Sequence, residues 1–229
     1  MRTSRSYGAR RREAKAALAT LFLLAAPAAA DEVTLVAMGD SLTQGYGLPE
    51  AEGFVPQMQD WLDARDAGVD LVNAGVSGDT TAGGLARVEW SLTPEVDGMI
   101  VALGGNDLLR GIDPAVSREN LRGILEAAEA RDLPVLLVGL EATGNYGADY
   151  KAAFDAMYPD LAEAYDTLYA ENFLGPLAGD GDPESARRFL QSDGIHPTGE
   201  GVARIVEALG PKVRDLAEAA RAETAETDG

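Results

Sequence analysis

Residues Val33–Gly47 (VTLVAMGDSLTQGYG) are the stretch that most constrains the fold of this chain. A short apolar run breaks here into a turn at Gly39-Asp40-Ser41. Such a run, closed by a polar turn, is typical of a buried parallel strand that brings a side chain to its carboxyl end. A serine placed there, beside the free N–H groups of a following helix, is well sited as a nucleophile. Ser41 is therefore the first candidate functional residue.

Further apolar runs alternate with segments of helical periodicity along the rest of the chain. The other expected strands are Val69–Val72, Gly98–Leu103, Val135–Leu140 and a short one near Asn172–Leu174; the expected helices are Phe54–Asp66, Ala82–Ser91, Pro114–Arg131, Ala148–Tyr169, Glu184–Leu190 and Pro197–Ala220. We expect Pro159 to kink or divide its helix, and the chain after about Ala220 to be frayed. This alternation predicts an α/β fold with a parallel sheet of about five strands, covered on both faces.

The first 30 residues have the pattern of a secretory signal peptide. A basic segment precedes an apolar stretch, Ala16–Ala26, and the small residues Ala28-Ala29-Ala30 form a cleavage site. The apolar stretch is short for a membrane span, so we expect cleavage near Ala30 and a periplasmic or secreted protein. The consecutive arginines Arg10–Arg12 leave twin-arginine export open as an alternative route. Residues 31–229 are expected to form a single domain.

The chain is strongly acidic, with a formal net charge of −19. The first 30 residues carry six basic residues and one acid, so their removal would leave −24. Such a surface repels nucleic acids and anionic lipids, so we expect no nucleic-acid partner and no stable membrane insertion. The absence of cysteine excludes disulfides and thiolate metal sites. We expect no metal, no cofactor and a monomeric protein.

His196 is the single histidine of the chain. Any hydroxyl that is activated by an imidazole must therefore use His196. Asp193 lies three residues earlier, where its carboxylate can fix the imidazole tautomer and stabilise the imidazolium. The order serine, aspartate, histidine also fits an α/β-hydrolase, but Ser41 lacks the second glycine of the G-x-S-x-G turn. Ser77 is a competing nucleophile, although a serine in such a turn is usually structural.

A nucleophilic serine also needs hydrogen-bond donors for the oxyanion that forms during acyl transfer. The Ser41 N–H is one candidate. The Gly78 N–H is a second, since a residue without Cβ lets substrate approach closely. The side-chain amide of Asn106, after the third expected strand, is the third.

Four ordered blocks carry a family resemblance: Gly39–Leu42, Gly78, Gly104–Asp107 and Asp193–Pro197. Together they resemble the SGNH, or GDSL-type, hydrolases, close to the periplasmic thioesterase I, lysophospholipase and arylesterase group. The resemblance implies a three-layer, flavodoxin-like α/β/α fold. It also implies Ser41 as nucleophile, His196 as general base, Asp193 as its partner, and an oxyanion hole made by Ser41, Gly78 and Asn106. Asp40 would shape the turn.

The expected activity is hydrolysis of acyl esters or thioesters by an exported serine esterase, acting on a small or lipid-derived substrate. An apolar cleft is expected from four residues: Leu108, Leu109, Ile112 and Tyr146. A carbohydrate-ester deacetylase on the same scaffold is an alternative, and a non-catalytic binding domain is a more remote one. Nucleotide binding is disfavoured because neither glycine-rich phosphate motif occurs.

Overall fold

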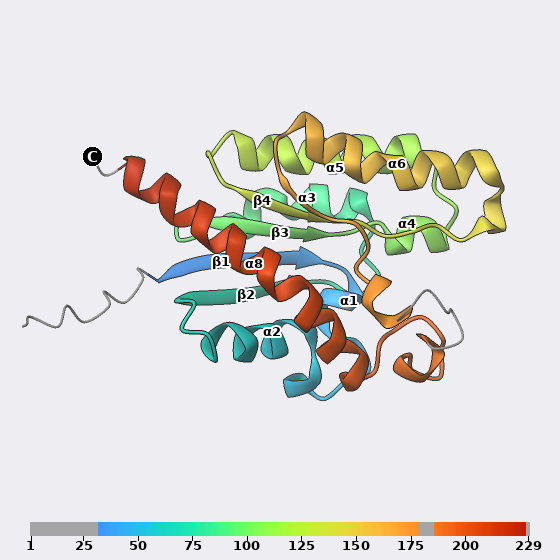
Figure 1. Ribbon diagram of the computed structural model, residues 1–229. Coiled ribbons are helices and arrows are strands. Elements are labelled where there is room, and N and C mark those ends of the chain that lie inside the picture. The colour runs from blue at the N-terminus through green and yellow to red at the C-terminus, as the bar shows by residue number, and fades with distance from the viewer. Residues whose placement is uncertain (1–31, 179–185, 228–229) are drawn as a thin grey trace, which may run out of the picture.

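Five parallel strands form a single sheet at the centre of the computed structural model, which describes residues 32–178 and 186–227 (Figure 1). The expected signal peptide, residues 1–30, lies outside the described residues. In spatial order the strands are β2 (Val69–Gly75), β1 (Val33–Gly39), β3 (Gly98–Ala102), β4 (Val135–Val138) and β5 (Leu168–Ala170). This is the flavodoxin-like order, and it reverses between β1 and β3. Ligands bind outside the carboxyl ends of the strands at such a reversal.

Helices cover both faces of the sheet, which confirms the three-layer α/β/α prediction. The α-helices are α1 (Ser41–Gln44), α2 (Phe54–Asp63), α3 (Thr81–Ser91), α4 (Gly105–Leu109), α5 (Pro114–Glu129), α6 (Ala148–Ala164) and α8 (Gly199–Thr227). Short 3-10 turns are η1 (Glu50–Glu52), η2 (Gly144–Tyr146), η3 (Gly175–Ala178) and η4 (Arg187–Phe189). Helices α2 and α8 pack together on one face, and α3, α5 and α6 pack on the other (Figure 1). Within the described residues, no helix has the length and apolarity needed to cross a membrane.

The core forms because the central strands are apolar on both faces. Strands β3 and β4 are buried along their whole length, and β1 is buried at all but one position. A parallel sheet between two helical layers requires this continuous apolar pattern. Each fully buried aliphatic side chain contributes about 1.5–3 kcal/mol relative to an exposed one. The three strands with this pattern were therefore the ones that sequence identified most directly.

Two predicted elements differ from the structure. The fifth strand is Leu168–Ala170, not Asn172–Leu174, so the prediction of a helix as far as Tyr169 was also wrong. Helix α6 ends at Ala164, and Asp166 adopts φ +48°, a left-handed conformation that aspartate tolerates better than most residues. Pro159 does not divide α6, because it lies on the exposed side of the helix while Phe154, Tyr158 and other residues hold the opposite side in the core.

The last helix and the segment before it also differ from expectation. Helix α8 continues to Thr227, beyond the expected end near Ala220, and passes through Pro211. Its amino end is set by Thr198, whose Oγ1 accepts a hydrogen bond from the Gly201 N–H. The helix expected at Glu184–Leu190 is described only from Ala186, which is helical and leads directly into η4.

The edge strand β2 is covered by a side chain instead of a sixth strand. The Gln59 Nε2 donates to the Val69 carbonyl at 2.7 Å, and the Gln59 Oε1 accepts from the Leu71 N–H at 2.9 Å. Further along the same strand, the Asn73 Oδ1 accepts from the Gly75 N–H at 2.9 Å. These contacts satisfy backbone groups that an edge strand otherwise leaves unpaired.

Candidate active site

Ser41 lies at the tight turn where β1 ends and α1 begins. The Asp40 carboxylate accepts a hydrogen bond from the Leu42 N–H at 2.9 Å and so caps α1. Gly39 has no room for a side chain, because a Cβ would lie 2.0 Å from the Thr43 Oγ1. The glycine and the capping aspartate together explain why the strand can turn so sharply and present Ser41 at the carboxyl edge of the sheet.

His196 reaches Ser41 from the other end of the chain. The His196 Nε2 lies 2.8 Å from the Ser41 Oγ, and the His196 Nδ1 lies 2.7 Å from the Asp193 Oδ2. A carboxylate only accepts, so Nδ1 carries the hydrogen of the neutral ring and Nε2 is left to accept from the Ser41 hydroxyl. The three residues predicted from the sequence are therefore brought together in one hydrogen-bonded line.

Asp193 is held in its ionised form. Its Oδ1 accepts from the backbone N–H groups of Ile195 at 2.9 Å and His196 at 3.1 Å. The hydrogen bond from the His196 ring is the largest cause, followed by these backbone bonds, that lowers the pKa of Asp193 from 3.8 to about 2. An ionised carboxylate at this point stabilises a protonated imidazole.

The three predicted oxyanion donors follow different strands. Ser41 follows β1, Gly78 lies in the turn after β2, and Asn106 lies on α4 after β3. Gly78 has φ +85°, which a residue with a side chain rarely adopts, and its N–H makes no hydrogen bond within the described part of the chain. The Asn106 Nδ2 donates one hydrogen to the Asp40 Oδ2 at 3.3 Å, which leaves its second hydrogen available.

Two networks brace these donors. The Arg87 guanidinium donates to Asp79 at 2.7 Å and to the carbonyls of Ala74 and Gly39, at the ends of β2 and β1. The fully buried Asp107, next to Asn106, accepts from the Thr81 N–H at 2.8 Å and from the Thr81 hydroxyl at 2.5 Å. A buried carboxylate is tolerated only when it is hydrogen-bonded in this way. Asp107 therefore ties α4 to the start of α3, just after the Gly78 turn.

Asp40 has a larger part in the site than the sequence indicated. It is 2% exposed, and burial is the largest cause that raises its pKa from 3.8 to about 6, against the opposing effect of hydrogen bonds from Leu42 and Asn106. Its second oxygen orients the Asn106 amide. The sequence predicted only its role in the turn, because a contact between residues 40 and 106 leaves no local pattern.

An apolar cavity of about 210 Å³ opens beside Ser41. Leu108 and Leu109 line it, as predicted, whereas Ile112 and Tyr146 do not. The Tyr146 hydroxyl instead donates to the Leu109 carbonyl at 3.3 Å, at the end of helix α4 that carries the lining residues. The apolar lining residues that sequence reasoning missed are Leu42, Leu140, Leu174, Leu190 and Ile195. Their only sequence signal is that each lies within a few residues of a strand end or of one of the four motif blocks.

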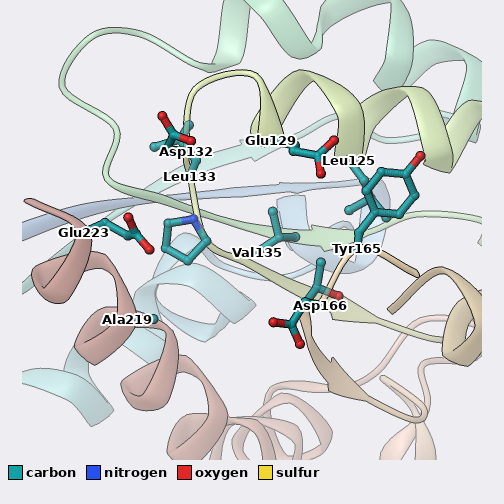
Figure 2. A pocket seen from close by; sticks show the side chains of 11 residues that line it. Leu125, Glu129, Asp132, Leu133, Val135, Tyr165, Asp166, Ala219 and Glu223 are labelled. Atoms are coloured by element: carbon teal, nitrogen blue, oxygen red, sulfur yellow. The ribbon is translucent and has the colours of Figure 1, made fainter. Parts of the chain in front are cut away.

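A larger hollow, of about 360 Å³, lies at the opposite end of the sheet, before β4 and β5. Figure 2 shows four carboxylates around it, from Glu129, Asp132, Asp166 and Glu223. It contains neither a histidine nor a serine. Within the described residues, no group of histidine and acidic side chains is arranged to hold a metal ion. This hollow therefore lacks the paired donor and base found at Ser41.

Comparison with known proteins agrees with this geometry. Residues 37–204 match the GDSL-like Lipase/Acylhydrolase family. The chain is 38% identical to "Esterase TesA" of Pseudomonas aeruginosa, over 86% of this chain and 94% of that protein. It is 33% identical to "Thioesterase 1/protease 1/lysophospholipase L1" of Escherichia coli, over 86% of this chain and 90% of that one. The crystal structure of AlinE4, an SGNH-hydrolase family esterase, matches with 42% identity and a TM-score of 0.66, over 80% of this chain and 95% of that one.

Proposed function

The chain belongs to the GDSL-like lipase/acylhydrolase family and is a serine ester hydrolase, and we propose that it is an exported enzyme that cleaves acyl esters or thioesters through an acyl-enzyme on Ser41. The observation that carries this proposal is the 2.8 Å contact between the Ser41 Oγ and the His196 Nε2, with Asp193 on the far side of the ring. A hydroxyl, a base and an orienting carboxylate in line are the requirements of nucleophilic acyl transfer.

In the acylation step the Ser41 Oγ attacks the carbonyl carbon of the substrate while its proton moves to the His196 Nε2. The negative oxygen of the tetrahedral intermediate takes hydrogen bonds from the Ser41 and Gly78 N–H groups and from the Asn106 amide. The intermediate collapses as the bond to the leaving alcohol or thiol breaks, and the imidazolium returns the proton to that group. A water molecule then repeats the sequence on the acyl-enzyme and releases the acid.

The size of the cavity favours short or medium acyl chains. Its volume of about 210 Å³ is below the roughly 300–1,000 Å³ of most small-molecule sites. Each methylene that is buried in it contributes about 0.8 kcal/mol, or roughly fourfold in kcat/KM, until the cavity is full. We therefore expect kcat/KM to rise along a series of p-nitrophenyl esters from acetate and to level off well before palmitate.

Replacement of the nucleophile tests the proposal. Ser41→Ala should lower the kcat for p-nitrophenyl butyrate by at least about 1,000-fold, because covalent catalysis is lost. Ser77→Ala is the matched control and should keep its activity, since among the described residues the Ser77 hydroxyl is bonded only to the Gln44 Oε1, at 2.8 Å. A fluorophosphonate should label Ser41 in the native protein, as read by mass spectrometry. Retained activity in Ser41→Ala, with no adduct on Ser41 in the native protein, would exclude this function.

Two further measurements address the substrate and the location. Acetylated xylan compared with acyl esters separates an acyl esterase from a carbohydrate-ester deacetylase. The apolar cavity and the names of the curated relatives favour the acyl esterase. Expression of the full chain in a Gram-negative host, followed by N-terminal sequencing of the periplasmic fraction, should give a mature protein that starts near Asp31. Size-exclusion chromatography with light scattering should give a monomer.

A further inference from the structure

Gln191 joins the two distant segments that meet at the proposed site, and we propose that it is a positioning residue that holds the His196 imidazole against Ser41. The inference rests on the proposed function, because it takes Ser41 and His196 to be the reacting pair. These two residues are 155 positions apart. A pair so distant in sequence keeps a 2.8 Å contact only if the segments that carry it are held together by other contacts.

The Gln191 side chain spans both segments. Its Nε2 donates to the Tyr46 carbonyl at 2.9 Å and to the Pro197 carbonyl at 2.9 Å. A side-chain amide has two hydrogens, so both are used. The Gln191 backbone N–H donates to the His196 carbonyl at 2.7 Å. Gln191 thus donates to two successive carbonyls in the segment that carries His196 and to one carbonyl in the segment that follows Ser41.

Tyr46 contacts both Ser41 and His196. The Tyr46 N–H donates to the Ser41 carbonyl at 3.1 Å. The Tyr46 ring lies against the imidazole, with 4.7 Å between the ring centroids and 39° between the ring planes. The residue that Gln191 holds by its carbonyl is therefore bonded to the nucleophile through its backbone and packed on the base through its ring.

In the described part of the chain, the other backbone hydrogen bonds of the His196 loop do not attach it to Tyr46. Leu190 and Pro197 form an antiparallel bridge, and the Thr198 N–H donates to the Phe189 carbonyl at 2.8 Å. These bonds shape the loop without attaching it to the Ser41 turn. The Gln57 Nε2 donates to the Gly199 carbonyl at 3.0 Å, but Gln57 belongs to α2. Loss of the Gln191 amide would therefore leave the loop folded but remove its hydrogen bond to the Tyr46 carbonyl.

Gln191→Met tests the proposal because methionine has nearly the same length and no donor. A displacement of about 1 Å in a reacting pair can cost up to about 100-fold in rate, so kcat for p-nitrophenyl butyrate should fall by about 10- to 100-fold. KM should change by less than about twofold, because Gln191 does not line the acyl cavity. Gln59→Met is the matched control. It removes another glutamine that bridges backbone groups, at the amino end of β2, and should leave kcat unchanged.

The single histidine provides a readout that does not depend on turnover. The His196 Nδ1–H that is bonded to Asp193 should give one downfield proton resonance in NMR spectra of the native protein and of Gln59→Met, and it should broaden in Gln191→Met. Native kcat and an unchanged resonance in Gln191→Met would overturn the proposal, as would an equal loss of kcat in both variants. If the native protein hydrolyses no ester, the proposed function fails. The resonance still shows whether Gln191 holds the His196 ring in place.

Gln191→Lys keeps the test decisive if Gln191→Met does not fold. The lysine ammonium can donate to both carbonyls. A folded Gln191→Lys protein should keep its kcat within about threefold of the native value and retain the His196 resonance. A kcat as low as that expected for Gln191→Met, or a broadened resonance, would show that donation to these carbonyls does not position the ring.

Discussion

Two hollows at opposite ends of the sheet differ in what lines them, and the smaller of the two lies beside Ser41. At the amino ends of β4 and β5 a space of about 360 Å³ is surrounded by carboxylates (Figure 2). At the carboxyl ends, a space of about 210 Å³ lies beside Ser41, Asn106 and apolar side chains. Strand polarity explains the difference, because parallel strands deliver their following loops to the same edge. Of these two hollows, the larger and more acidic one contains neither a serine nor a histidine.

The largest effect on activity is expected at the carboxyl end of the sheet, from the proposed oxyanion donor Asn106 on α4. Asn106→Ala should lower kcat by about 100- to 1,000-fold with little change in KM, because the donor acts mainly on charge that develops in the transition state. Steady-state kinetics on p-nitrophenyl butyrate measures both constants. Asn120→Ala is the control for the bracing network, since the Asn120 Nδ2 donates at 3.0 Å to the Thr81 hydroxyl and Asn120 does not line the cavity. Equal losses in the two variants would remove Asn106 from the oxyanion hole.

The next effect concerns the stability of the turn that carries Ser41. Burial raises the pKa of Asp40 to about 6, so the folded state binds its proton more tightly than the unfolded state does. The contribution of Asp40 to stability is then complete below about pH 4 and is lost as the pH rises through about 6. Asp40→Asn has no such titration. Relative to the native protein, it should gain up to roughly 3 kcal/mol between these pH values.

Urea unfolding of both proteins at a series of pH values measures this gain. The kcat of Asp40→Asn should fall at the same time, because the Asn106 amide loses its carboxylate acceptor. If the free energies of unfolding of the two proteins instead change in parallel from about pH 4 to pH 8, burial does not raise the pKa of Asp40. The carboxyl end of the sheet would then differ less from the amino end, where no such effect is expected.

The smallest effect is expected at the amino end. Glu129 and Asp166 are exposed, so the double change Glu129→Gln and Asp166→Asn should alter the free energy of unfolding by no more than about 0.5 kcal/mol per site. It should also leave kcat unchanged. Leu125→Ala, in the wall of the same hollow and 2% exposed, should instead cost about 2–5 kcal/mol. A loss of esterase activity in the double variant would show that the acidic hollow at the amino end also contributes to catalysis.

The sequence predicted the parts of the fold that burial controls. Strands β1, β3 and β4 were identified because their residues are apolar throughout. Strand β5 was missed because its three residues continue the apolar periodicity of α6. A signal was nevertheless present: α2, α5 and α6 each end near an aspartate with positive φ, namely Asp66, Asp132 and Asp166, and a strand follows within a few residues. Aspartate shortly before an apolar run thus marks a helix-to-strand turn in this chain.

Ser41, Asp193 and His196 were predicted because their types are scarce or locally patterned. One histidine leaves no choice of base, and an aspartate three residues before it is within reach. The contacts of Asp40 with Asn106 and of Gln191 with Tyr46 could not be predicted. Each joins side chains and carbonyls of segments that lie far apart in sequence, and neither produces a periodicity or a spacing.

The contacts of Gln59 with the edge of β2 hinder another polypeptide from adding a strand to the sheet. An extended segment that sought to lengthen the sheet would have to displace Gln59 from the Val69 carbonyl and the Leu71 N–H, and Asn73 from the Gly75 N–H. Strand addition, a common route to domain swapping and fibrils, therefore begins on this edge with the loss of three hydrogen bonds.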